Sequence, residues 1–322
     1  MICVTGAGGF IGHHLVKRLC ADGYEVRGVD LHEPLYELSP AKEFLVRDLR
    51  DYDQCDQAFT DVSDVFHLAA DMGGIGYITL SLAQVARNNV RLDTNVLEVA
   101  SKQRIRVFYA SSACVYNREL QESKDSAPLS EPMAYPADPE PGYGWEKLFA
   151  EELCKYHAQD FGLKVRIARF HNVYGPQGTY DGGREKAPAA ICRKIAMASP
   201  GGEVHLWGNG QQRRSFLYVD DCVEGLLRLM RSEIEQPINL GSELAVSIEE
   251  LASLIMEISG KSVRVVWEPD KPRGVGYRNS DSLLARVMLG WEPRVSLKAG
   301  LTTTYWWIVG QLKREGRYAP IG

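Results

Sequence analysis

Short runs of β-branched and other apolar residues alternate along the chain with longer stretches whose apolar residues recur every three or four positions. The first pattern predicts strands and the second predicts amphipathic helices. Their alternation is typical of a parallel sheet with helices on both faces. The predicted strands are 2–5, 26–30, 44–48, 65–68, 106–111 and 165–170, and the predicted helices are 10–22, 80–103, 143–161, 220–231, 247–259 and 298–314.

Composition places the chain among ordinary globular proteins, since it has 322 residues, of which 45% are hydrophobic and 25% are charged. A net charge of −5 argues against a nucleic-acid or anionic-membrane partner. No apolar run is long enough for a membrane span. Seven cysteines without a Cys-x-x-Cys pair indicate reduced thiols. Because a strand is expected from residue 2, we expect no signal peptide, a cytoplasmic location and, with no ligand spacing among the histidines, no metal.

A glycine-rich turn follows the first predicted strand. Gly6, Gly9 and Gly12 stand where a backbone approaches a pyrophosphate and where a helix packs on a strand, although Ile11 takes the last glycine position of the Gly-x-Gly-x-x-Gly form. Asp30 ends the second strand, where a carboxylate binds ribose hydroxyls and repels a 2′-phosphate. The pattern predicts NAD, rather than NADP, as the cofactor.

The alternation loosens after Phe170. The fold class we expect is therefore α/β, with a doubly wound parallel sheet of the Rossmann type and a smaller α/β substrate-binding lobe. The predicted NAD-binding domain comprises 1–172 with 215–242, and the predicted lobe comprises 173–214 with 243–322. The stretch 128–141 is predicted to be a surface loop, because five of its residues are prolines.

Tyr143 and Lys147 are four residues apart, so they lie on one face of a predicted helix. A Tyr and a Lys on one face can do acid–base chemistry. Ser112 and Cys114 follow the apolar strand that precedes this helix. Together with the glycine turn, these residues indicate an enzyme that uses a nicotinamide cofactor.

These features resemble the extended short-chain dehydrogenase/reductase family, which acts largely on nucleotide sugars. The resemblance covers nearly the whole chain. Five segments are similar, in the same order, to the GDP-mannose 3,5-epimerases: AADMGGIGY (69–77), SSACVY (111–116), FHNVYGP (170–176), GGREKAPAA (182–190) and RNSD (278–281). The residues that the resemblance implies for NAD binding are Gly6, Gly9, Phe10, Ile11, Gly12, Asp30, Asp48, Leu49, Ala69, Tyr143 and Lys147.

The resemblance also implies a reaction. The hydroxyl at carbon 4 of the sugar is oxidised by hydride transfer to NAD, with Tyr143 as base and Ser112 as hydrogen-bond partner. Lys147 and the cofactor's positive charge are expected to lower the phenol's pKa from about 10. The ketone then acidifies carbons 5 and 3, and Cys114 and Lys186 match the acid/base pair that inverts them, with the roles of the two left open. Reduction of the ketone gives GDP-L-galactose, GDP-L-gulose or both.

The chemistry around residues 173–214 suggests an anionic ligand. This segment holds six Lys or Arg against three acids, a local charge of +3. Pro188 suits a helix start, so Lys186 would face the positive end of a helix dipole. By resemblance the ligand is a GDP-sugar and the assembly a homodimer that pairs helices 80–103 and 144–161. The implied substrate residues are Gly73, Gly74, Ser112, Asn172, Glu185, Lys186, Ala187, Lys194, Gln212, Arg214 and Arg278.

Other interpretations stay open. Cys114 is also compatible with a small buried core side chain, and Lys186 with a solvated surface charge. A UDP- or GDP-sugar 4-epimerase needs the same Tyr, Lys and Ser but no second acid/base pair. A 4,6-dehydratase has an Asp-Glu pair where this chain has Ala113 and Cys114. A non-catalytic NAD-sensing regulator of the same fold would need neither Tyr143 nor Lys147.

Overall fold

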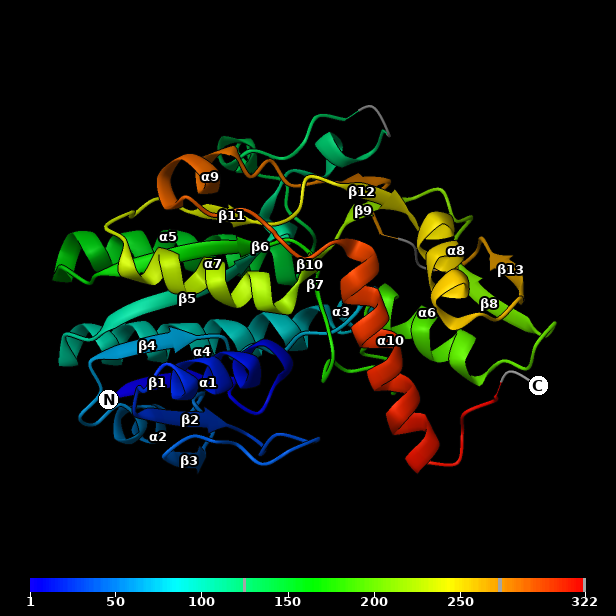
Figure 1. The fold of residues 1–322 in the computed structure, drawn as a ribbon. Helices are drawn as coiled ribbons and strands as arrows, with labels where there is room; N and C mark the ends of the chain where they lie inside the picture. Colours follow the sequence, from blue (N-terminus) through cyan, green and yellow to red (C-terminus); the bar gives the residue numbers. More distant parts are fainter. Residues whose placement is uncertain (124–125, 272–273, 321–322) are drawn as a thin grey trace.

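The computed structural model describes residues 1–123, 126–271 and 274–320. Its centre is a seven-stranded parallel sheet in the order β11-β6-β5-β4-β1-β2-β3 (Figure 1). The order reverses between β1 and β4, and ligands of open α/β sheets bind at the carboxyl ends of the strands beside such a reversal. The strands are β1 Ile2–Thr5, β2 Val26–Asp30, β3 Glu43–Val46, β4 Asp64–His67, β5 Arg106–Ser112, β6 Val165–Phe170 and β11 Ile238–Leu240.

Helices cover both faces of this sheet (Figure 1). One buried apolar cluster joins α1 and α7 to one face, and a second joins α2, α4 and α5 to the other. The two faces of the parallel strands are therefore both buried, which explains their nearly continuous apolar sequences. These helices are α1 Phe10–Ala21, α2 Tyr52–Ala58, α4 Leu82–Gln103, α5 Tyr143–Phe161 and α7 Val219–Arg231.

Local sequence signals set the ends of these helices. Gly162 ends α5 in the left-handed conformation, at φ 69°, where glycine carries no Cβ penalty. The Asp51 side chain caps α2 by accepting from the Gln54 amide, and Ser247 and Glu250 form a reciprocal capping box at the start of α8. The helix boundaries therefore follow from short-range chemistry as well as from packing.

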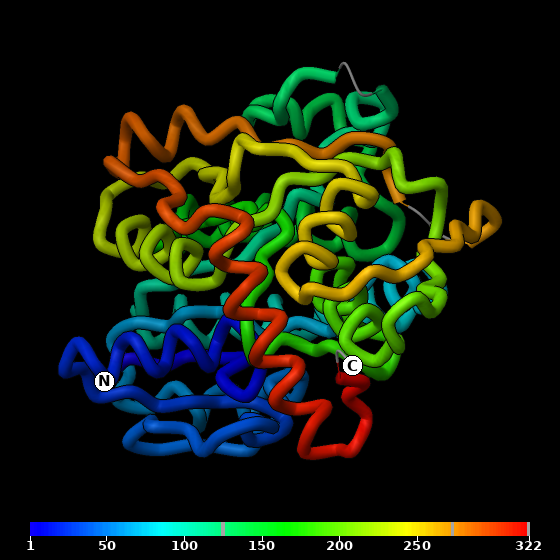
Figure 2. Tube along the Cα trace, turned by 45° about the vertical axis from the view of Figure 1, so that its right-hand side comes forward, coloured from blue at the N-terminus to red at the C-terminus, as the bar shows by residue number. Residues whose placement is uncertain are grey.

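A second group of elements lies beside the sheet. Strand β8 pairs with β13, β9 lies between β12 and β14, and β7 pairs with β10. In Figure 2 the red helical segment of the trace is α10, which lies beside α6 and α8 and packs on them. These elements are β7 Val173–Tyr174, β8 Glu203–Trp207, β9 Arg213–Ser215, β10 Leu217–Tyr218, β12 Ala245–Ser247, β13 Arg264–Glu268, β14 Tyr277–Arg278, α6 Ala187–Met197, α8 Ile248–Ser259, α9 Leu283–Leu289 and α10 Leu297–Arg314.

The expected α/β fold class and each predicted strand and helix occur, with two corrections. The predicted helix 80–103 begins at Leu82, as α4, because the backbone at Ser81 leaves the helical conformation at φ −126°, and a short helix that was not predicted, α3 Ile75–Leu80, precedes it. The stretch 128–141 is a loop with one 3-10 helix and mostly exposed prolines, as predicted, but it lies only partly at the surface, since Leu129, Ala134 and Glu140 are buried and Leu129 bridges Ser280. Its prolines prevent a long helix but not packing. Three short 3-10 helices complete the chain: η1 Ala113–Val115, η2 Arg118–Gln121 and η3 Glu131–Ala134.

Within the described residues, no helix combines the length and apolar character needed to cross a membrane. The division into two domains at the boundaries given above remains a prediction.

Candidate functional site

The glycine turn between β1 and α1 leaves no room for side chains. A Cβ on Gly8 would lie 2.1 Å from the His32 carbonyl oxygen, and a Cβ on Gly12 would lie 2.0 Å from that of Gly6. Gly6 has φ +71°, and its Cβ would lie 2.7 Å from the Ala69 amide nitrogen. The turn therefore presents bare backbone and the N-terminus of α1, which begins at Phe10 and Ile11, and this arrangement fits a pyrophosphate.

Asp30 stands beside this turn. Its carboxylate accepts hydrogen bonds from the amides of Gly8 at 3.0 Å and Leu31 at 2.6 Å. A small cavity opens between residues 8–10 and 34–37. The predicted carboxylate and the glycine turn are thus adjacent, as a dinucleotide requires. Asp48, by contrast, pairs with Arg50 at 2.7 Å, and Leu49 is buried in the core.

The turn after β5 meets the start of α5. Ser112 Oγ accepts from the Cys114 amide at 3.2 Å, and the Cys114 carbonyl accepts from the Glu140 amide at 3.0 Å. A Cβ on Gly144 would lie 2.3 Å from the same Cys114 oxygen, so α5 packs closely on this turn. Tyr143 and Cys114 share one buried cluster with Val85. The structure therefore brings three of the predicted catalytic residues together: Ser112, Cys114 and Tyr143.

Lys147 lies one turn along α5 from Tyr143, with Nζ 5.9 Å from the centre of the phenol ring. Burial raises the pKa of Tyr143, and Lys147 lowers it, but the net direction is upward. The expected net lowering is therefore not produced by the protein groups, because desolvation of the phenolate outweighs the charge of Lys147. The contribution of Lys147 alone lowers the pKa of Tyr143, as predicted.

Lys147 is held in a buried polar network that the sequence did not reveal. Its Nζ donates to the Tyr109 hydroxyl at 2.9 Å and lies 3.5 Å from Asp93 and 3.2 Å from Glu146. Burial lowers the pKa of Lys147, but Asp93 and Glu146 raise it more, so its pKa is raised overall. His67 closes the network, with Nε2 2.9 Å from Asp93 Oδ1. This lysine therefore stays an ammonium ion.

Arg278 reaches the Cys114 thiol. Its Nη1 lies 3.6 Å from Cys114 Sγ, its Nη2 donates to Glu140 at 3.0 Å, and its Nε donates to Gln121 at 2.6 Å. Burial lowers the pKa of Arg214 to about 9, and Arg278 lowers it as well, so the two guanidinium groups share one electrostatic environment. Arg278, which is expected to bind substrate, is therefore also a neighbour of Cys114, the expected acid/base residue.

Lys186 is the N-cap residue of α6, immediately before Ala187. The residue is partly exposed, and burial lowers its pKa, while Cys114 raises it. The Gly74 amide donates to the Arg184 carbonyl at 2.9 Å, and a Cβ on Gly74 would lie 2.4 Å from the Glu185 carbonyl oxygen. The structure thus joins the loop that contains Gly73 to the loop that contains Lys186.

The remaining predicted substrate residues lie on or beside the elements of the second group. Asn172 has φ +43° and donates to the Ser215 carbonyl at 2.9 Å. Gln212 is buried, and its Oε1 has no hydrogen-bond partner among the described residues. Lys194 donates instead to the His205 carbonyl at 2.6 Å, and Glu185 accepts from Arg193 at 3.0 Å. These contacts hold the Asn172, Lys194 and Glu185 side chains in place.

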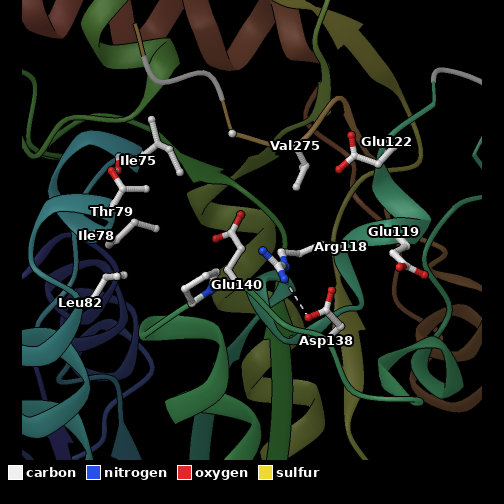
Figure 3. Close-up of a pocket in the computed structure, with 12 residues that line it drawn as sticks. Ile75, Ile78, Thr79, Leu82, Arg118, Glu119, Glu122, Asp138, Glu140 and Val275 are labelled. Carbon is white, nitrogen blue, oxygen red and sulfur yellow. Dashed lines mark hydrogen bonds and ion pairs between the residues drawn. The ribbon is translucent and has the colours of Figure 1, made fainter.

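A cavity of about 500 Å³ opens beside Glu140 (Figure 3). In Figure 3, Ile75, Ile78 and Leu82 lie on one side of it, and the Glu140 carboxylate projects into it. Arg118 pairs with Asp138 at 2.9 Å on the cavity wall. The volume and the mixed lining are typical of a small-molecule site. In the part of the chain that the structure describes, no three His, Cys, Asp or Glu residues are placed to share a metal ion.

Three comparisons bear on this site. Residues 2–241 match the model of the NAD dependent epimerase/dehydratase family. GDP-mannose 3,5-epimerase 1 of Oryza sativa subsp. indica is 44% identical over 317 residues, which cover 98% of this chain and 83% of the relative. Among solved structures, Thermotoga maritima UDP-glucose 4-epimerase with UDP-glucose has a TM-score of 0.87 at 29% identity, covering 97% and 99% of the two chains. Bacillus cereus UDP-glucuronic acid 4-epimerase with UDP-glucuronic acid and NAD has a TM-score of 0.84 at 27% identity, with the same coverage.

Proposed function

The chain belongs to the NAD-dependent epimerase/dehydratase family and is an NAD-dependent enzyme of the nucleotide-sugar epimerase type; on that premise, we propose that it is a GDP-mannose 3,5-epimerase. The observation that carries the proposal is that Cys114 shares a buried cluster with Tyr143 and donates its amide to Ser112, while the loop that contains Lys186 joins the loop of Gly73 and Gly74. Lys147 lies one turn further along the helix of Tyr143. A second acid/base pair, Cys114 and Lys186, is thus available in addition to Tyr143, Ser112 and Lys147. A 4-epimerase needs only the last three of these residues. The five segments that resemble the GDP-mannose 3,5-epimerases support the same conclusion.

NAD is the cofactor of this family, and the residues at the carboxyl ends of β1 and β2 fit it. When bound, it supplies an acceptor and donor of hydride at carbon 4 of the sugar. Gly6, Gly9 and Gly12 would let its pyrophosphate approach the N-terminus of α1, and Asp30 would accept from its ribose hydroxyls. The buried ammonium of Lys147 would hold a fixed positive charge beside this part of the site.

The chain's own groups divide the proton transfers between them. Tyr143 would take the proton of the carbon-4 hydroxyl, while Ser112 holds that oxygen by a hydrogen bond. Cys114 and Lys186 would then move protons at carbons 5 and 3, whose acidity rises while carbon 4 is a ketone. Tyr143 would return its proton when the hydroxyl forms again.

The GDP group would bind among Asn172, Lys194, Gln212 and Arg214, with Glu185 and Ala187 near the sugar. The local charge of +3 over 173–214 suits a diphosphate. The buried Oε1 of Gln212, which has no partner in the described part of the chain, suits a donor on the ligand. These assignments rest on the resemblance and on the positions of the side chains.

We also propose that the enzyme is a homodimer. Helix α5 exposes Trp145, Phe149 and Tyr156 at 50%, 50% and 53% of their surface, and α4, which packs on α5, exposes Leu82. A surface of large apolar side chains on two neighbouring helices is typical of a subunit interface. Light scattering after gel filtration would test this by giving a mass near twice 35.9 kDa.

The test of the proposed function is product identification in heavy water. The wild-type protein with NAD should convert GDP-mannose and place deuterium on carbons 3 and 5, whereas the hydrogen on carbon 4 stays protium because it travels as hydride. Tyr143→Phe should give no product and no deuterium, because no ketone forms. Inversion of carbon 4 alone, in GDP-mannose or in a UDP-sugar of the same NMR panel, would identify a 4-epimerase and refute the proposal.

A further inference from the structure

Two loops meet beside the candidate site, and Tyr77 stands at their junction. The first loop, 71–77, follows β4 and runs into α3. The second loop, 181–186, ends at Lys186, the N-cap residue of α6. The Arg184 guanidinium of the second loop lies over the Tyr77 ring of the first, with Cζ 3.8 Å from the ring centre. This is a cation–π contact, in which the face of an aromatic ring attracts a guanidinium group.

The backbones of the two loops are in contact as well. The Gly74 amide donates to the Arg184 carbonyl at 2.9 Å. A Cβ on Gly73 would lie 3.0 Å from the Cβ of Tyr77, so a glycine there lets the Tyr77 side chain approach. A main-chain hydrogen bond and a side-chain stack therefore join the loops at neighbouring points.

Asp71 holds both partners of the stack. Its Oδ1 accepts from the Tyr77 hydroxyl at 2.7 Å and lies 3.4 Å from Arg184 Nη1. Its Oδ2 accepts from Asn88 at 2.8 Å and its amide donates to Asn89 at 2.6 Å, so α4 holds Asp71 in turn. Burial raises the pKa of the Asp71 carboxyl, but hydrogen bonds from Tyr77 and Asn88 lower it more, so it is ionised. The guanidinium group thus faces an anchored anion and a ring together.

Tyr77 also contacts the surroundings of the other proposed acid/base residue. It packs against the buried cluster that contains Cys114 and Tyr143. Arg184, which lies over the same ring, is two residues before Lys186. Tyr77 therefore links the cluster of Cys114 to the loop of Lys186.

The second loop has an open stretch just before Arg184. The glycines at 182–183 have φ +89° and +85°, and apart from their chain neighbours a Cβ on either would meet no atom of the described residues within 4 Å. Glu185 accepts from Arg193 at 3.0 Å, which ties it to α6 itself. Arg184 instead crosses to Tyr77 and so ties the loop to the side of the main sheet.

We propose that Tyr77 and Arg184 are positioning residues, whose contact holds the second loop against the first and so fixes Lys186 relative to Cys114. This inference rests on the proposed function, in which Lys186 and Cys114 move protons at the same sugar carbons. A misplacement of about 1 Å can slow such a step roughly a hundredfold. Tyr143 is carried by α5, so the hydride step should not depend on the Arg184 contact.

The first arm of the test measures the contact without turnover. Hydrogen exchange of the Gly74 amide in the NAD-loaded enzyme is followed by mass spectrometry, with fragmentation that resolves single amides. Because this amide donates to the Arg184 carbonyl, separation of the loops exposes it to solvent. Arg184→Gln removes the cation from the stack, so the amide should exchange at least about tenfold faster than in the wild type. Exchange at the wild-type rate in this variant would overturn the proposal.

Further variants separate the contact from a general loss of structure. Arg184→Lys keeps a cation and Tyr77→Phe keeps the ring, so both should exchange at close to the wild-type rate, whereas Tyr77→Leu should match Arg184→Gln. Arg104→Gln removes an exposed arginine just before β5, at the opposite edge of the sheet, and should leave the exchange unchanged. If Tyr77→Leu fails to fold, Arg184→Gln still decides, because the Arg184 side chain is 48% exposed.

The second arm compares two steps of one turnover with GDP-mannose in heavy water. Arg184→Gln should place deuterium on carbons 5 and 3 at least about tenfold more slowly, while reduced nicotinamide forms at nearly the wild-type rate. Arg184→Lys should restore most of the deuterium incorporation. Equal slowing of both steps by Arg184→Gln would show a general structural role and overturn the proposal. A wild-type enzyme that leaves GDP-mannose unchanged would refute the proposed function, while exchange at Gly74 would still decide whether Tyr77 and Arg184 hold the loops together.

Discussion

Lys147 and Lys186 are the same type of residue in two different environments. Lys147 lies between Asp93 and Glu146, and its pKa is raised. Lys186 begins α6 with no carboxylate within reach among the described residues, and its pKa is lowered. A lysine that must supply a constant charge needs anionic neighbours, whereas a lysine that must lose and regain a proton works better without them. This difference in charge environment distinguishes two regions of the site: the region around Lys147, which supports the proposed hydride transfer, and the region around Lys186, which is proposed to move protons.

The largest effect should come from Lys147→Met. It leaves the buried Asp93 carboxylate without its cation, which costs roughly 3 kcal/mol or more of unfolding free energy. Activity should fall roughly a thousandfold or more. Urea unfolding of Lys147→Met and Lys186→Met compares the loss of unfolding free energy in the two variants. Lys186→Met should cost little stability, because it removes an amine whose charged form burial already disfavours. Equal destabilisation by the two variants would show that their surroundings do not differ as described.

Glu146→Gln tests the surroundings of Lys147 through a smaller effect, on the pH dependence of stability. Burial raises the pKa of Glu146 from 4.5 to about 8, while Lys147 opposes the rise. Because the folded state favours the protonated acid, wild-type stability should fall as pH rises from about 4.5 to about 8 and stay level above that range. Glu146→Gln should remove this pH dependence of the unfolding free energy. Loss of a partner of Lys147 can also change the stability of the variant, but by the same amount at each pH. Unfolding free energies at pH 5, 6.5 and 8 test it; parallel profiles for wild type and variant would count against a raised pKa.

The sequence predicted the parts of the site that depend on local order. Gly6 follows the first predicted strand, Gly12 lies in the first turn of the helix after it, and Asp30 ends the second strand, so sheet topology alone brings them together. Tyr143 and Lys147 share α5, and Ser112 ends β5, which α5 contacts. Residues of this kind are recognisable because a short motif and a strand end define their positions.

The sequence could not predict the electrostatic surroundings. Asp93 occurs in an amphipathic helix and Glu140 in a proline-rich stretch, where carboxylates usually face solvent. Arg278 is 164 residues from Cys114, and only the pairing of β14 with β9 places it nearby. The position of Glu140, between prolines and just before a helix that begins with Tyr143, was the one local signal that could have drawn attention to it.

The pKa of Tyr143 shows the same limit. Sequence proximity to Lys147 predicted a lowered value, but the degree of burial, which depends on Cys114, Val85 and their neighbours, reverses the net direction. The charges in a motif give the sign of one contribution to the pKa shift. The net shift also depends on how deeply packing buries the phenol.

The most direct test of the account is a single turnover of the NAD-loaded Lys186→Met variant with GDP-mannose in heavy water. If Lys186 moves protons and Lys147 supports the hydride step, absorbance near 340 nm should rise as the nicotinamide is reduced, and no inverted sugar should form. Inverted product with deuterium at carbons 3 and 5, formed at the wild-type rate, would show that Lys186 is not part of the acid/base pair and would contradict the division between the two regions.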